Sequence, residues 1–293
     1  MRLDVALIRK YPELSRRKAR DVIEKGQVTV DGATVVEAGR ACAEGAALLW
    51  DPNLKARRRL RPPLPLLHQD DVLLVVDKPA GLLSVPTEPG ADDEDTVYGR
   101  LQAFVRHLRP KRPYVGLVHR LDRDTSGALA FALDPATRAA LRSLFKAHHI
   151  ERRYEALVLG RPEADAGTVD APLADEYVGR RRVARPGEPS HAALTRWRVL
   201  ERLPGAARLE VELETGRQHQ IRVHLAHAGF PVLGDAVYGA GSAHRLHLRV
   251  PRQLLHARLL AFAHPQDGRL LRVESPLPED FAGVLAALRR RRR

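Results

Sequence analysis

The sequence predicts an α+β protein with a small amino-terminal domain and a larger second domain. Its 293 residues are 44% hydrophobic and 29% charged, enough apolar material for a sizeable core. Segments with helical spacing of apolar residues and segments with strand-like alternation are interspersed along the chain. A basic, Pro-rich stretch at residues 51–66 is typical of a linker. We therefore expect domains at residues 1–50 and 67–288, followed by an Arg tail at 289–293.

The charge balance indicates a nucleic-acid partner. Lys and Arg number 49 and Asp and Glu number 36, which leaves a net charge of +13. We find no apolar run of about twenty residues and no signal-peptide pattern, so we expect a cytoplasmic protein without a membrane partner. Cys42 is the only cysteine, which excludes an internal disulfide and a cysteine-based zinc site.

Residues 1–50 predict two helices and a hairpin. Apolar residues from Leu3 onward recur at helical spacing, and Ser15 is a good cap for a second helix. Asp31-Gly32 between alternating valines is a strong signal for a two-residue hairpin. One face of the second helix carries the candidate phosphate-binding residues Arg16, Arg17 and Arg20. A charge run on a helix is also consistent with a solvated face, so both interpretations stay open.

The sequence of the second domain predicts alternating strands and helices. A long polar stretch at residues 163–190 is expected to run over the surface, and the five terminal arginines are expected to be a disordered cationic tail. The expected elements are strands at 71–76, 115–118, 128–133, 153–159 and 208–213, and helices at 97–105, 134–145 and 221–228.

The chain is organised around residues 119–127, HRLDRDTSG, which place charges between two apolar strands. Asp122 is the candidate reactive centre at this sheet end. Arg120 and Arg123 flank it, and nearby cations favour an ionised carboxylate even when it is partly desolvated. The alternative is a solvated turn in which the polar residues 124–126 hydrogen-bond their own backbone.

This stretch resembles the motif of the Rlu-type RNA pseudouridine synthases, which isomerise uridine in ribosomal and transfer RNA. Further stretches resemble that family in the same order: DKPAG, RRYEALVLG with Arg152 in place of a lysine, TGRQHQIRVH and GFPVLGDAVYG. Residues 1–50 resemble the RNA-binding domain first seen in ribosomal protein S-four. They depart from it at Gly45-Ala46, where Gly-Asp is usual.

The resemblance implies a mixed, largely antiparallel sheet with a cleft where the Asp122 turn meets Arg222. It implies that Asp122 attacks or deprotonates the nucleoside, that Arg222 holds this carboxylate, and that Tyr154 supports the base. Arg120 would fill the gap that the flipped nucleotide leaves. Within the same motifs, Lys78, His119 and Arg217 are added as candidates for substrate binding.

The implied reaction breaks a glycosidic bond, turns the uracil and rejoins it through carbon, so no cofactor is expected. Three histidines, at 219, 224 and 227, match no zinc spacing, and no metal is expected. We expect a monomer that modifies large-subunit ribosomal RNA. The alternatives are a transfer-RNA enzyme, a catalytically idle RNA-binding assembly factor, and a glycosidase that uses Asp122 with Asp124.

Overall fold

The computed structural model describes residues 1–52, 54, 63–87, 95–177, 179–239 and 246–291. It divides the chain into two compact units, Met1–Arg61 and Pro62–Arg293, and each is described separately below. Most of the expected linker, residues 53 and 55–62, lies outside the described residues. No helix in the described ranges is long and apolar enough to cross a membrane.

The small unit contains the predicted helices and hairpin. Ser15 Oγ accepts a hydrogen bond from Lys18 N–H at 3.2 Å and so caps the second helix. Asp31 and Gly32 have φ of 50° and 79°, as a two-residue hairpin requires. The elements are α1 (Leu3–Lys10), α2 (Arg16–Glu24) and a sheet of order β2-β1-β3 built from β1 (Val28–Val30), β2 (Ala33–Val35) and β3 (Leu48–Trp50).

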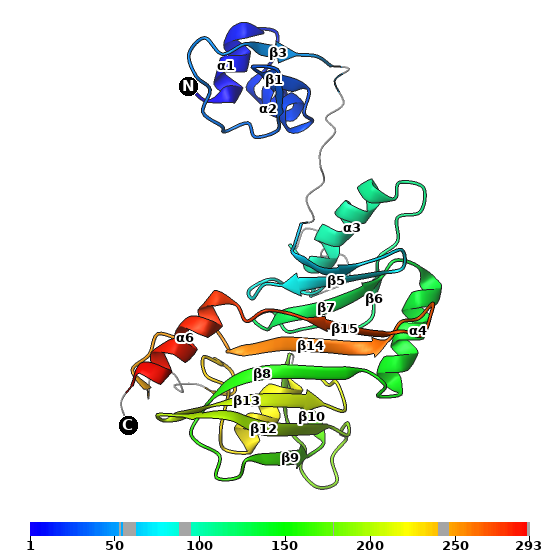
Figure 1. Cartoon of the computed structure of the whole chain (residues 1–293), viewed down its shortest axis with the longest axis vertical. Coiled ribbons are helices and arrows are strands. Elements are labelled where there is room, and N and C mark those ends of the chain that lie inside the picture. The colour runs from blue at the N-terminus through cyan, green and yellow to red at the C-terminus, as the bar shows by residue number, and fades with distance from the viewer. Residues whose placement is uncertain (53, 55–62, 88–94, 178, 240–245, 292–293) are drawn as a thin grey trace. The chain divides into compact units, whose positions relative to one another are not determined.

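The large unit is built on a ten-stranded, largely antiparallel sheet, which confirms the predicted fold class (Figure 1). Along its path the strand order is β4-β5-β7-β14-β8-β13-β12-β9, with β6 paired to β7 and β15 to β14. The strands are β4 (Leu66–Gln69), β5 (Leu73–Lys78), β6 (Gly116–Leu117), β7 (Ser126–Ala132), β8 (Glu151–Leu159), β9 (Ala166–Asp170), β12 (Leu194–Leu203), β13 (Ala206–Leu213), β14 (Leu255–Ala263) and β15 (Leu270–Glu274).

Four helices and a separate hairpin complete this unit. Asp134 caps α4 by accepting a hydrogen bond from Thr137 N–H at 2.8 Å, as Asp-Pro at a helix start predicts. The helices are α3 (Val97–Leu108), α4 (Pro135–Lys146), α5 (Gln220–His227) and α6 (Glu279–Arg290), and the hairpin is β10 (Leu173–Tyr177) with β11 (Arg180–Val183).

The two halves of the sheet meet where β7 pairs with β14, the only parallel pairing among the described strands. Gly127 lies opposite Ala257 there with φ of 117°. A Cβ on Gly127 would stand 2.3 Å from the carbonyl oxygen of Ala257, so only glycine permits this approach. The final glycine of HRLDRDTSG therefore anchors the Asp122 turn at the junction.

Two irregular segments differ from expectation. The described residues of 163–190 are largely exposed, as expected of a surface stretch, but they also contain three strands that were not expected, β9, β10 and β11. Their polar sequences lack an apolar alternation, and backbone pairing with neighbouring strands supplies the order that local propensity does not. The Arg tail does not begin at 289, because α6 continues to Arg290 and Arg289 pairs with Glu201 at 2.6 Å. Residues 292–293 lie outside the described part of the chain.

Candidate active site

A cleft of about 540 Å³ is lined by the Asp122 turn, α4, β8, the start of α5 and Leu255 of β14. The structure brings most of the predicted site residues into it. Those that line the cleft are Asp122, Arg222, Tyr154, Arg120, His119 and Arg217.

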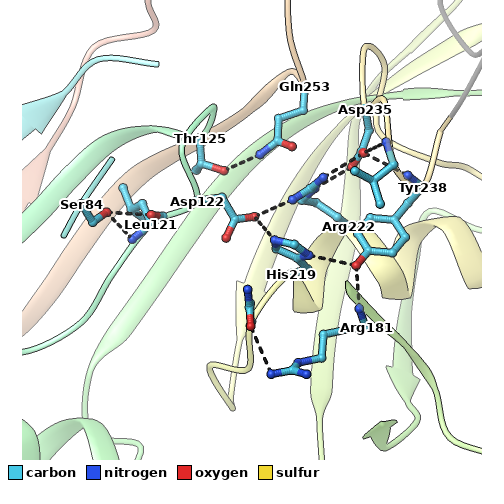
Figure 2. Close-up of polar contacts among 12 residues, drawn as sticks. Ser84, Leu121, Asp122, Thr125, Arg181, His219, Arg222, Asp235, Tyr238 and Gln253 are labelled. Carbon is cyan, nitrogen blue, oxygen red and sulfur yellow. Dashed lines mark hydrogen bonds and ion pairs between the residues drawn. The ribbon is translucent and has the colours of Figure 1, made fainter. Parts of the chain in front are cut away.

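Hydrogen bonds with the side chains of Ser84 and Lys78 hold the backbone of the Asp122 turn. Ser84 Oγ accepts from Leu121 N–H at 3.0 Å and donates to Leu121 O at 2.6 Å (Figure 2). Lys78 Nζ donates to the carbonyl of Arg123 at 2.8 Å and to that of Pro79 at 2.9 Å. These contacts fix the direction in which the Asp122 side chain leaves the turn.

The position of Lys78 contradicts its expected role in substrate binding. We expected it to bind substrate, but its side chain is fully buried and outside the cleft lining. Burial lowers the pKa of its ammonium to about 7, against the opposing charges of Asp124 and Asp122. Its two carbonyl partners make it a support for the turn, and it has no exposed surface with which to reach a phosphate.

Arg222 joins two carboxylates. Its Nη1 donates to Asp122 Oδ2 at 3.0 Å, while Nε and Nη2 form a bidentate pair with Asp235 at 2.6 and 2.9 Å. Burial opposes the charged guanidinium, but the hydrogen bonds that it donates to Asp235 and the charge of Asp122 raise the pKa of Arg222 above its usual value. Arg222 is thus a fixed cation that holds one oxygen of Asp122.

Asp235 was missed as a functional residue by the sequence interpretation. It follows Gly234, whose φ is 77° and whose Cβ, if present, would stand 1.9 Å from Arg252 O. The tight turn at this glycine directs the carboxylate at Arg222. The sequence carried a usable signal, because Gly234 and Asp235 both lie within the GFPVLGDAVYG stretch.

His219 and Tyr238 form a pair beside Asp122 that the sequence interpretation also missed. The backbone N–H of Arg181 donates to Tyr238 Oη at 2.9 Å, and that hydroxyl lies 2.9 Å from His219 Nδ1. His219 Nε2 lies 4.0 Å from Asp122 Oδ2 (Figure 2). Burial lowers the pKa of His219, against the charge of Asp122, so the imidazole is neutral at neutral pH. These two hydrogen-bonded contacts connect β11 to the imidazole that lies next to the candidate reactive carboxylate.

The arginines that flank Asp122 in sequence do not pair with it. Among the described contacts none joins Arg120 or Arg123 to its carboxylate, and Arg120 is exposed at the cleft. The cation that contacts the Asp122 carboxylate is Arg222, which lies 100 positions away along the chain. The contact is therefore made by Arg222, the residue that the resemblance implied, and not by the two flanking arginines.

The other cleft residues have distinct environments. His119 Nε2 accepts from Ala130 N–H at 3.0 Å, and its ring stacks on Phe145 at 4.8 Å. Burial lowers the pKa of His119 to about 3, which keeps it neutral. Arg217 is exposed and donates from Nε to Ala192 O at 3.1 Å. The Tyr154 side chain is buried at the cleft wall, and this burial raises the pKa of its hydroxyl.

The arginines of α2 lie in the small unit. Asp4 is fully buried there and pairs with Arg20 at 3.0 Å, with Arg2 at 3.1 Å and with Arg16 at 3.9 Å. Arg17 is exposed. One carboxylate therefore anchors a basic face that remains open to solvent.

The three histidines of the α5 region do not converge. His219 contacts Tyr238, His224 lies 2.8 Å from Thr195 Oγ1, and His227 is exposed. Across the described ranges there is no group of three or more His, Cys, Asp or Glu side chains that could hold a metal ion.

Comparison with known proteins gives matches to both units. Residues 72–227 match a family described as RNA pseudouridylate synthase, and residues 1–46 match the S4 domain. Proteins named ribosomal large subunit pseudouridine synthase D are 37% identical in Pseudomonas aeruginosa and 38% identical in Nitrosomonas europaea. These alignments cover 99% of this chain and 93% and 85% of the relatives.

A solved structure is also similar. The human RNA pseudouridylate synthase domain containing 4 protein superposes with a TM-score of 0.65 at 27% identity, covering 77% of this chain and 93% of that one. The similarity thus extends from sequence to the arrangement of strands.

Proposed function

Since the chain belongs to the RNA pseudouridylate synthase family, we propose that it isomerises specific uridines of large-subunit ribosomal RNA. The chain is an RNA pseudouridine synthase, an isomerase. Its relatives from Pseudomonas and Nitrosomonas carry the large-subunit name, which favours ribosomal RNA over transfer RNA. We further propose a monomer that acts in the cytoplasm, with residues 1–50 as an RNA-binding module on the 51–66 linker.

The observation that carries the proposal is the carboxylate of Asp122. Its Oδ2 is engaged by Arg222, and the group lies in the wall of a cleft large enough for a nucleoside. Among the described residues that line this cleft, Asp122 is the only carboxylate. A glycosidase needs a second one across the bond, so that alternative is disfavoured.

In the proposed mechanism the target uridine leaves its helix and enters the cleft. Asp122 attacks or deprotonates the nucleoside, Arg222 holds the carboxylate in place, and Tyr154 supports the base. The N1–C1′ bond breaks, the uracil turns, and C5 bonds to C1′. The proton on C5 leaves and N1 gains one, so no group carrier or redox partner is needed. Arg120, His119 and Arg217 contact the RNA around the flipped nucleotide.

The test is to map pseudouridines in a strain that lacks this gene and to add the purified protein to the undermodified RNA. We expect specific positions in large-subunit ribosomal RNA to lose the modification and to regain it on addition of the protein. Loss confined to transfer RNA would reassign the substrate. Unchanged RNA in both experiments would instead support an idle assembly factor.

A further inference from the structure

Arg152 differs from the other buried arginines. In the described part of the chain, three arginines are at least nine-tenths buried: Arg152, Arg222 and Arg252. Arg222 forms a bidentate pair with Asp235, and Arg252 forms one with Asp280. No described ion pair involves Arg152. It is a buried cation without an acid.

The contacts of Arg152 leave part of its guanidinium uncommitted. Nη2 donates to Leu213 O at 3.0 Å and to Glu214 O at 2.8 Å, whereas Nε is buried without a hydrogen-bond partner. Burial lowers the pKa of the group, since no carboxylate offsets its desolvation. An unpaired buried charge is costly, and such costs concentrate at functional sites.

The side chain of Arg152 lies where the base should bind. Arg152 and Tyr154 are two residues apart on β8, so both project from the same face, and both line the cleft. The guanidinium lies 5.6 Å from the centre of the Phe145 ring. Gly216 makes room for it, because a Cβ there would stand 2.6 Å from Nη1.

We propose that Arg152 donates hydrogen bonds to a carbonyl oxygen of the target uracil and stabilises the negative charge that develops on the ring. This inference rests on the proposed function. When the N1–C1′ bond breaks, its electron pair stays on the uracil and is shared by O2 and O4. If Asp122 instead adds to the ring, charge also builds on a carbonyl oxygen. Arg152 keeps its protons throughout and acts as a preorganised electrostatic partner.

A ring carbonyl fits Arg152 better than a phosphate does. The exposed Arg142, Lys146 and Arg217 already offer cations at the rim of the cleft, where an RNA backbone would pass. A buried planar donor next to Tyr154 suits a planar base. Contact with O4 would in addition select uracil, because position 4 of cytosine carries an amino group that donates rather than accepts, whereas O2 is common to both bases.

The experiment compares Arg152→Met and Arg152→Lys with the matched control Arg153→Met. Arg153 is the next residue on β8, is absent from the cleft lining and pairs with Glu151. At saturating RNA, Arg152→Met should lower the single-turnover rate about 100-fold, as loss of one oxyanion donor does. Its RNA affinity and salt dependence should stay near wild type. Arg152→Lys should recover part of the rate, and Arg153→Met should keep all of it.

Two results would overturn the proposal. One is a wild-type single-turnover rate in Arg152→Met. The other is a rate largely kept with a salt slope reduced by about 0.7–0.9, which would assign Arg152 to a phosphate. Both need an active wild-type enzyme, so they are distinct from failure of the proposed function, in which wild-type protein forms no pseudouridine.

A substrate-side measurement covers the case in which Arg152→Met folds poorly. RNA with sulfur in place of O2 or O4 of the target uridine presents a weaker acceptor. At least one substitution should slow the wild type more than it slows Arg152→Lys, because the two changes affect the same contact. Equal slowing of both proteins by both thio-substituted RNAs would reject the contact.

Discussion

Each of the two units contains a partly buried cluster of arginine and aspartate side chains, but the two residue types occur in opposite proportions. In the small unit the fully buried Asp4 serves three arginines, whose side chains are 46–64% exposed. In the large unit the guanidinium of Arg222, 7% exposed, serves both Asp122 and Asp235. The cluster in the small unit therefore has an excess of exposed positive charge, whereas the Arg222 cluster has an excess of sheltered negative charge. The first arrangement suits phosphate binding, and the second prepares a reactive carboxylate.

The largest effect is expected from removing the sheltered negative charge. Asp122→Asn keeps the shape of the side chain but not its charge, so pseudouridine formation should fall by at least about 10³-fold. RNA affinity should stay nearly intact, because the exposed arginines proposed to bind phosphate are untouched. Single-turnover assays and filter binding measure the two quantities. Appreciable activity in this variant would refute Asp122 as the reactive group.

The second-largest effect is expected from removing Arg222, the cation that Asp122 and Asp235 share. Arg222→Ala releases Asp122 from its position, which should cost on the order of 10²-fold in rate. It also leaves Asp235 buried and unpaired, at a cost of about 3–5 kcal/mol in the free energy of unfolding. Arg222→Lys is the control that retains charge without the bidentate geometry. Wild-type rates in Arg222→Ala, alongside normal urea unfolding, would reject the pairing.

Substitutions of Tyr154 test whether a base occupies the cleft of the large unit. Tyr154→Ala should lose about 1–3 kcal/mol of stacking, whereas Tyr154→Phe retains the ring and isolates the hydroxyl. Single-turnover rates and affinity for RNA with the target uridine measure the difference. If Tyr154→Ala turns over and binds like wild type, Tyr154 has only a structural role.

Removal of residues 1–61 tests the exposed positive charge. Affinity for structured RNA should fall, and the slope of log affinity against log salt should flatten by about 0.7–0.9 for each lost phosphate contact. Turnover at saturating RNA should change much less, because the small unit acts through tethering. A truncated enzyme with the same affinity and salt slope would show that the arginine face of α2 is merely solvated.

The smallest effect concerns Asp4 itself. Burial opposes its charge, but hydrogen bonds from Arg2 and Arg20 lower its pKa below 3.8. A lowered folded-state pKa adds stability above about 3.8, and this stability is lost as the pH falls through the folded value. Asp4→Asn should weaken the small unit at pH 7 and flatten its acid dependence. Amide exchange in α1 and α2 measures this, with Glu24→Gln at an exposed position of α2 as control.

Local chemistry explains which features the sequence predicted. The cap at Ser15, the hairpin at Asp31-Gly32, the Asp134 cap and the strands around the Asp122 turn all depend on neighbouring residues. The fold class and the pairing of Asp122 with Arg222 came from the family resemblance. Neither can be read from a short segment.

The missed features depend on residues that are distant in sequence. The sequence around Lys78 does not distinguish it from a surface lysine. Its burial and its hydrogen bond to the carbonyl of Arg123 identify it as a buried support of the turn. Asp235 becomes meaningful only once Arg222 lies beside it. The strands between residues 163 and 190 are polar, and their partners provide the order. Tertiary contacts decide each of these cases.

The parallel pairing of β7 with β14 has a consequence for synthesis of the protein. Ser126 and His256, which pair across it, are 130 positions apart, and closing so long a loop is slow. During translation the Asp122 turn leaves the ribosome well before β14 exists to complete the sheet beneath it. The nascent chain therefore carries the exposed arginines of α2 early and its assembled cleft late. Enzymatic competence is a property of the nearly finished polypeptide.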